Sequence, residues 1–87
     1  MVTDDLVRLA MARRLARDGT GRRVRQAVDF SLNDVAEHCG VSHVTVRRWE
    51  AGERRPSREP ALLYADLMVS LARVAGMDLG AVSAGGR

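Results

Sequence analysis

The side chains capable of metal binding or catalysis are few in this sequence. His38, Cys39 and His43 lie close together and carry the donor atoms of a zinc site. Structural zinc requires four ligands, so these three residues do not predict a metal site, and we expect no metal and no cofactor. No Gly-rich phosphate loop, nucleophile with an oriented base, or convergent pair of carboxylates can be assembled. The sequence therefore predicts a protein that is not an enzyme.

Arginine is the most informative charged residue. All 14 basic side chains are arginines, against 11 acidic ones, which gives a net charge of +3. Residues 13–58 contain eleven of the arginines and six acids, whereas each flanking segment has a net charge of −1. A basic middle segment indicates an acidic partner such as nucleic acid, and a solvated charged surface is the alternative.

Length and composition limit the fold. The chain has 87 residues, enough for one small core, and 46% of them are hydrophobic. With only three aromatic residues and many Leu, Val, Ala and Met, the composition favours packed helices, so we expect an all-α core. A single cysteine, no resemblance to a secretion signal and no apolar run of roughly 20 residues predict a cytoplasmic protein without membrane contact.

Capping residues and glycines divide the chain into about five helices. The expected helices run from an N-cap at Thr3 to about Arg17, from Gly21 after a Thr20 cap to about Val28, between Ser31 and Gly40, from Ser42 to about Ala51, and from Ser57 to about Val74. We accordingly expect an amphipathic helix in residues 1–19, the main domain in residues 20–76 and a flexible tail in residues 77–87.

Apolar residues at helical spacing predict the buried faces. The faces expected for the first, second and last helices are Leu6, Val7, Ala10, Met11 and Leu15; Val24, Ala27 and Val28; and Leu62, Leu63, Leu67, Met68, Leu71 and Val74.

The segment 31–52, SLNDVAEHCGVSHVTVRRWEAG, resembles the helix-turn-helix of the phage repressor and Cro-like family. Ala36 is small where two helices cross, Gly40 permits a turn with positive φ, and Trp49 is apolar where the second helix packs back. The ending, with Arg55-Pro56-Ser57 after the glycine, also matches the family. The resemblance covers about residues 20–74 and implies a lambda-repressor-like bundle, with Cys39 buried at the apolar position before the turn.

Residues of the second helix of this motif are the candidates for contact with bases. On a helical wheel, Val44 and Arg48 lie opposite Val46 and Trp49, with Arg47 on one flank. Arg48 suits guanine and Val44 a thymine methyl group, while the alternatives are a phosphate contact for Arg48 and a tolerated exposed side chain for Val44. The remaining candidates, at the start of the helix, are Ser42 and His43.

A second group of residues is expected to contact phosphates or the minor groove. Arg54, Arg55 and Arg58 follow the motif in a loop that the fold places near the DNA backbone. Ser31, at the start of a helix, is expected to bind a phosphate or to serve only as an N-cap.

Glu50 falls about 40° from Val46 on the same helix, at the margin of the core, where an unpaired carboxylate is costly. In the family that the chain resembles, this glutamate pairs with an arginine, and the matching residue here is Arg25. We therefore expect a structural ion pair between Arg25 and Glu50.

The resemblance implies a sequence-specific regulator of repressor or Cro type that occupies an operator in double-stranded DNA, as a homodimer at least on DNA, with no small-molecule ligand. Two alternatives remain at this point. One is an antitoxin that regulates its own promoter and holds a toxin through the N-terminal helix. The other is a protein-interaction module that has lost DNA binding.

Overall fold

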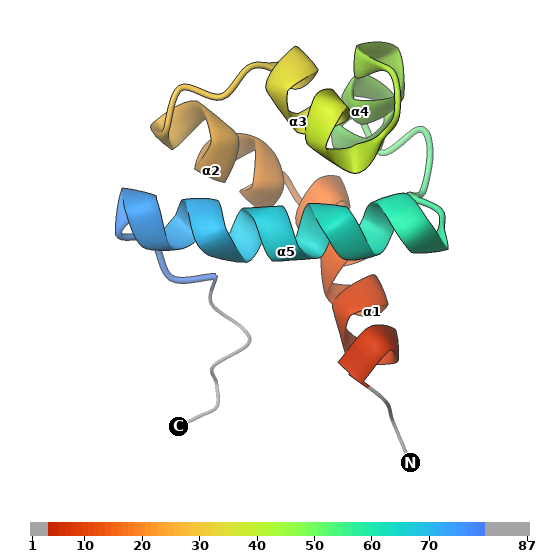
Figure 1. The fold of residues 1–87 in the computed structure, drawn as a ribbon, viewed down its shortest axis with the longest axis horizontal. Coiled ribbons are helices and arrows are strands. Elements are labelled where there is room, and N and C mark those ends of the chain that lie inside the picture. The colour runs from red at the N-terminus through yellow and green to blue at the C-terminus, as the bar shows by residue number, and fades with distance from the viewer. Residues whose placement is uncertain (1–3, 80–87) are drawn as a thin grey trace.

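Five α-helices form the computed structural model, which describes residues 4–79 (Figure 1). No strand occurs in that range, so the expected all-α bundle is confirmed. The helices are α1 (Asp4–Arg17), α2 (Thr20–Ala27), α3 (Leu32–Cys39), α4 (His43–Glu50) and α5 (Arg58–Ala75).

The predicted turn between α3 and α4 is built by local hydrogen bonds. The Ser31 hydroxyl accepts the N–H of Asp34 at 3.0 Å, and the Asp34 carboxylate accepts the N–H of Ser31 at 2.8 Å. Gly40 ends α3 with φ of 72°, a left-handed conformation that glycine adopts without steric cost. The Ser42 hydroxyl then caps α4 by accepting the N–H of Thr45 at 3.1 Å. These caps fix the angle between the two helices.

At two positions, the structure does not form the N-cap hydrogen bond that the sequence predicts. Thr20 is the first residue of α2 and not its N-cap, because its N–H donates to the Asp18 carboxylate at 2.9 Å while Gly19 takes the capping position with φ of 87°. Burial raises the pKa of Asp18, but the hydrogen bonds from Thr20 and the nearby Arg14 outweigh it and leave that pKa below its ordinary value. Ser57 is the N-cap of α5 but makes no capping hydrogen bond with its side chain. The expected cap at Thr3 lies outside the described residues.

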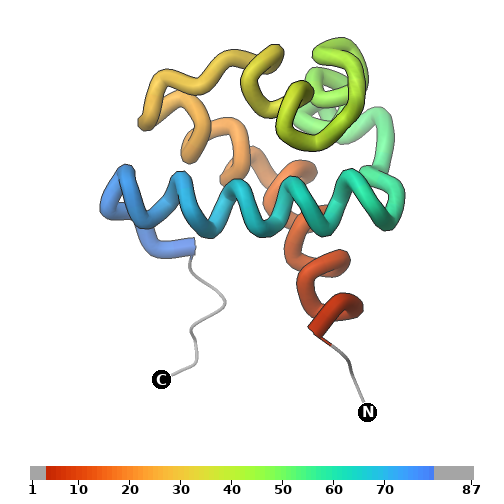
Figure 2. The backbone as a smooth tube through the Cα atoms, viewed as in Figure 1, coloured from red at the N-terminus to blue at the C-terminus, as the bar shows by residue number. Residues whose placement is uncertain are grey.

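Helix α5 is the common packing surface of the bundle. It runs across the molecule, with α2, α3 and α4 along one side and α1 crossing it (Figures 1 and 2). After Gly76 the chain turns back, and Met77 and Leu79 pack against the core. The described beginning of the predicted tail is therefore packed on the bundle, and the remainder of that tail lies outside the described residues.

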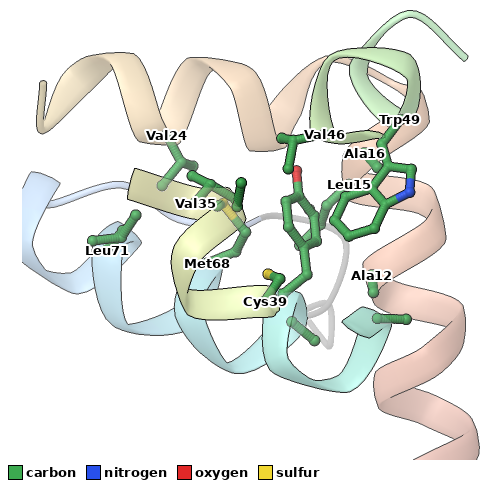
Figure 3. Close-up of a cluster of buried hydrophobic side chains, with 14 of the residues drawn as sticks. Ala12, Leu15, Ala16, Val24, Val35, Cys39, Val46, Trp49, Met68 and Leu71 are labelled. Atoms are coloured by element: carbon green, nitrogen blue, oxygen red, sulfur yellow. The ribbon is translucent and has the colours of Figure 1, made fainter. Parts of the chain in front are cut away.

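The core draws side chains from all five helices, and Figure 3 shows its centre. Trp49 of α4 meets Tyr64 of α5 edge to face, with ring centroids 5.5 Å apart and an interplanar angle of 79°. Such aromatic pairs contribute about 0.5–1.5 kcal/mol beyond their buried area. The other large, fully buried side chains are Leu15, Val24, Val35, Val46, Pro56 and Met68.

The apolar faces predicted for α1 and α2 were wrong in part. In α1 the prediction favoured the large aliphatic residues near the start of the helix. In α1, Leu6, Val7 and Ala10 are exposed, while Ala12 and Ala16 are buried with Leu15. Alanine permits the close approach of α1 to α5 at their crossing. The expected inward position of Ala27 is also exposed.

In α5 the buried face is rotated relative to the prediction. Leu63 and Val74 are exposed, and Leu62 and Leu67 are half-buried, whereas Tyr64 is fully buried. The residues that share the buried face recur every three or four positions: Ala61, Tyr64, Ala65, Met68, Leu71 and Ala72.

The first prediction concerns the contact of Gly21 with Tyr64. A Cβ at position 21 would lie 1.9 Å from the Tyr64 hydroxyl oxygen and 3.3 Å from the carbonyl oxygen of Leu15. Gly21→Ala is therefore expected to destabilise the fold by about 1–3 kcal/mol, the usual cost of overpacking, despite the higher helix propensity of alanine. Urea unfolding of the purified variant measures this change.

Tyr64→Phe provides the matching control. The Tyr64 hydroxyl is buried and has no hydrogen-bond partner in the described structure, so its removal is expected to leave stability unchanged or raised. In the double variant, loss of the oxygen is expected to recover part of the stability that Gly21→Ala removes. Purely additive effects of the two substitutions would contradict this steric account.

Candidate nucleic-acid interface

The exposed side of α4 gathers most of the residues predicted to contact bases. Val46 and Trp49 are buried against the bundle, and this anchoring turns Arg47 and Arg48 to the solvent. At the start of the helix, Ser42 and His43 are also exposed. The structure thus presents two guanidinium groups, a hydroxyl and an imidazole from one short helix.

Two of these residues are less available than the sequence suggests. Val44 is half-buried and not fully exposed, so only part of its side chain can meet a ligand. The Ser42 hydroxyl already accepts the N–H of Thr45 and shares a hydrogen bond of 3.0 Å with the Thr45 hydroxyl. Both positions are therefore partly committed to the fold.

Arg25 and Glu50, for which an ion pair was expected, form a bidentate pair. Arg25 Nε donates to Glu50 Oε2 at 2.6 Å, and Arg25 Nη2 donates to Glu50 Oε1 at 2.9 Å. The side chains are only 11% and 7% exposed. Arg25 Nη1 also donates to the carbonyl oxygen of Phe30 at 3.1 Å. One guanidinium therefore connects α2, the segment after it and α4.

The electrostatics of this pair favour its charged form. The hydrogen bond to Glu50 raises the pKa of Arg25, which outweighs the opposite effect of burial. An arginine is already protonated at all physiological pH values, so the charge of Arg25 is permanent. It serves as a permanent link between helices.

An open polar cleft lies beside this ion pair, between α2 and α4. Its volume is about 290 Å³, and Arg22 of α2 and Arg47 of α4 both line it. Arg22 is exposed and was absent from the candidates chosen from the sequence. Its spacing of three residues before Arg25 places it on the same side of α2, which is the signal that could have identified it.

The loop after α4 is held against α1. Gly52 has φ of 75°, and the N–H groups of Glu53 and Arg54 both donate to the carbonyl oxygen of Arg48, at 2.9 and 3.3 Å. Pro56 is buried, and its carbonyl oxygen accepts a hydrogen bond of 3.0 Å from Arg13 Nε.

The three arginines expected to act together from this loop are divided by the structure. Arg54 and Arg55 are exposed. Arg58 lies in the first turn of α5 and pairs with Asp5 of α1 at 3.4 Å. The side chain of Arg58 is therefore directed to the start of α1, and an acidic group already neutralises part of its charge.

Ser31 occupies a helix N-terminus with a carboxylate beside it. The capping box uses the N–H groups of Ser31 and Asp34, which leaves those of Leu32 and Asn33 without a helical acceptor. An anion at this position would meet those two amides together with the charge of Asp34. The site is weaker for phosphate than a neutral cap would be.

The residues considered for metal binding do not form a site in the described structure. His38 and His43 are exposed, whereas Cys39 is buried in the core, and burial raises the pKa of its thiol to about 11. Within residues 4–79, no group of three or more His, Cys, Asp and Glu side chains could hold a metal ion. The same residues contain no helix long and apolar enough to span a membrane.

A family model described as helix-turn-helix matches residues 22–68, which is more than half of the chain. The chain belongs to the helix-turn-helix family of the phage repressor and Cro type. This is a family of DNA-binding transcription regulators, and α4 occupies the place of its recognition helix. The match does not include α1, which precedes the matched residues in the chain. Comparisons with curated proteins and with solved structures gave no significant match.

The second prediction concerns the ion pair that holds the recognition helix. Replacing only Arg25 or only Glu50 by alanine leaves one charge nearly buried and unpaired, so each single variant is expected to lose about 3–5 kcal/mol of stability. The double variant is expected to lose less than the sum of the two. A double-mutant cycle from denaturant unfolding measures the coupling. Independent, additive losses would show that the pair does not link the two helices energetically.

Proposed function

We propose that this protein is a sequence-specific regulator of repressor or Cro type that binds an operator in double-stranded DNA and blocks RNA polymerase by occupying it. The observation that supports this proposal most strongly is the exposed pair Arg47 and Arg48 on a helix whose other side is fixed by Trp49 and the Arg25–Glu50 pair. A helix of this size fits the major groove, and a rigid anchor lets its side chains select bases.

The exposed residues of α4 have distinct roles in this proposal. Arg48 contacts guanine through its two terminal nitrogens, and Arg47 contacts either a base or the flanking phosphate. Ser42 and His43 contact base edges near the start of the helix, which enters the groove most deeply. Val44, being half-buried, offers a small apolar contact to a thymine methyl group.

Phosphate contacts supply affinity without base preference. Arg54 and Arg55 suit this role, because they are exposed and no ion pair occupies them in the described structure. Ser31 contributes through the start of α3. Arg58 contributes less than the other two arginines, because Asp5 competes for its guanidinium.

Two copies of the chain are expected on one operator. A single module of this kind covers about 600–1,000 Å² of protein surface, too little for tight discrimination among sites. Leu63 and Val74 of α5 are exposed, at 40% and 76%, and give an apolar surface through which two copies can associate.

The antitoxin hypothesis depends on how much of α1 is available to a partner. It required an N-terminal helix available to a toxin, and α1 leaves Leu6 and Val7 exposed but buries Ala12, Leu15 and Ala16 in the core. We therefore favour the operator-binding regulator. The exposed arginines of α4 also argue against an interaction module that has lost DNA binding.

The third prediction tests sequence preference. Selection of bound duplexes from a random pool is expected to yield a two-fold symmetric motif with half-sites about one helical turn apart. On that motif, Arg48→Ala is expected to lose about 1–3 kcal/mol of binding free energy and to flatten the preference at one guanine. Val44→Ala is expected to act in the same way, more mildly, at a thymine. Titration of matched and base-substituted duplexes measures both effects.

Equal weakening of matched and scrambled duplexes by Arg48→Ala would show that Arg48 holds a phosphate instead of a base. A selection that yields no enriched motif would contradict the proposed function itself. An asymmetric motif would contradict binding as a two-fold dimer.

The fourth prediction separates affinity from specificity. Arg55→Ala is expected to weaken binding to matched and scrambled duplexes by the same factor, because a phosphate contact is independent of sequence. It is also expected to reduce the slope of log K against log salt by about one unit. Fluorescence anisotropy titrations at four or more salt concentrations measure both quantities. A change in base preference caused by Arg55→Ala would contradict this assignment.

A further inference from the structure

The last turn of α1 and the loop after α4 together form a small basic cleft. The cleft has a volume of about 90 Å³ and is open to solvent. Its polar lining comes from two segments that are far apart in sequence, and buried Trp49 and Pro56 complete it. The four arginines that line it are Arg13, Arg17, Arg54 and Arg55.

The position of this cleft is fixed by contacts between α1 and the loop. Arg13 Nε donates to the carbonyl oxygen of Pro56 at 3.0 Å, which ties the loop to the middle of α1. Ala16 lies close to Trp49 at the end of the recognition helix (Figure 3). The loop therefore cannot move away from Arg17 without breaking a hydrogen bond and opening the core.

Three of the arginines that line this cleft have no carboxylate partner in the described structure. Arg8, Arg14, Arg25 and Arg58 each pair with a carboxylate. By contrast, no acidic side chain is among the residues that line the cleft, and Arg17, Arg54 and Arg55 make no ion pair within residues 4–79. An anion bound at this cleft would meet arginine side chains whose charge no carboxylate in the described structure neutralises.

We infer that α1, the helix outside the family match, supplies Arg17 to a phosphate-binding site that it shares with Arg54 and Arg55. The ligand is one backbone phosphate of the DNA, next to the groove that α4 occupies. Arg13 is a positioning residue, because its Nε holds the loop and not the ligand. This inference rests on the proposed function, and it assigns a part in DNA binding to α1, a helix outside the residues that match the family.

The chain offers a matched control for Arg17. Arg73 is also exposed, also lies in the last turn of a helix, and makes no ion pair in the described structure. It belongs to α5, near the end that lies farthest from the loop after α4 (Figure 1). Both Arg17→Ala and Arg73→Ala remove one charge from a helix C-terminus, so any loss caused by the helix dipole or by net charge is common to both.

The test is a titration of a fluorescent 24-base-pair duplex of random sequence at several salt concentrations. Arg17→Ala is expected to reduce the slope of log K against log salt by about one unit, and Arg73→Ala to leave it unchanged. Arg17→Lys, which keeps the charge, is expected to retain the wild-type slope. Thermal unfolding of the variants shows that the folded state is retained.

The double variant Arg17→Ala/Arg54→Ala measures the coupling between the two arginines. A loss of binding free energy that differs from the sum of the two single losses would support a shared phosphate. Equal slopes for Arg17→Ala and Arg73→Ala, while the wild-type protein binds, would overturn the role of α1 and leave the proposed function standing. Failure of the wild-type protein to bind any duplex would overturn the proposed function.

Discussion

The bidentate ion pair between Arg25 and Glu50 connects the parts of the fold that must keep a fixed geometry for the base selection proposed above. It joins α2 to the recognition helix, and a third hydrogen bond from the same guanidinium holds the carbonyl oxygen of Phe30 before α3 begins. Apolar contacts alone have no direction and would allow short helices to slide. Because α4 has only eight residues, a small rotation would turn Arg48 away from the base proposed for it. The pair removes that freedom.

The apolar side of the recognition helix depends on a second constraint, the close packing of α2 on Tyr64. The Tyr64 ring supports Trp49, and the Tyr64 hydroxyl occupies the space that a side chain at Gly21 would need. This hydroxyl has no hydrogen-bond partner in the described structure, so it costs free energy where it lies. Burial also raises the pKa of Tyr64 well above its ordinary value, which keeps the hydroxyl neutral. Ring packing outweighs the cost of the buried oxygen.

The arginines divide into those that hold the fold and those left for a ligand. Arg8, Arg14, Arg25 and Arg58 pair with carboxylates, and Arg13 bonds a carbonyl oxygen. The exposed arginines without an ion pair in the described structure include Arg47 and Arg48 on α4 and Arg17, Arg54 and Arg55 around the basic cleft. Composition gives the same positive charge to both groups. Only the position of the acidic side chains distinguishes them.

The sequence alone determined the five helices and the turn at Gly40, because capping residues, glycines and a local motif act over a few residues. The partner of Glu50, Arg25, was expected only from the resemblance to a known family. The sequence could not determine which face of α1 and α5 is buried. That choice depends on how closely two helices cross: Ala12 and Ala16 are buried in place of the larger Leu6 and Val7 in α1, and Tyr64 in place of Leu63 in α5. It also could not show that Arg58 meets Asp5, or that Arg17 and Arg54 line one cleft. Such long-range juxtapositions exist only after packing, because they depend on the crossing angles of whole helices.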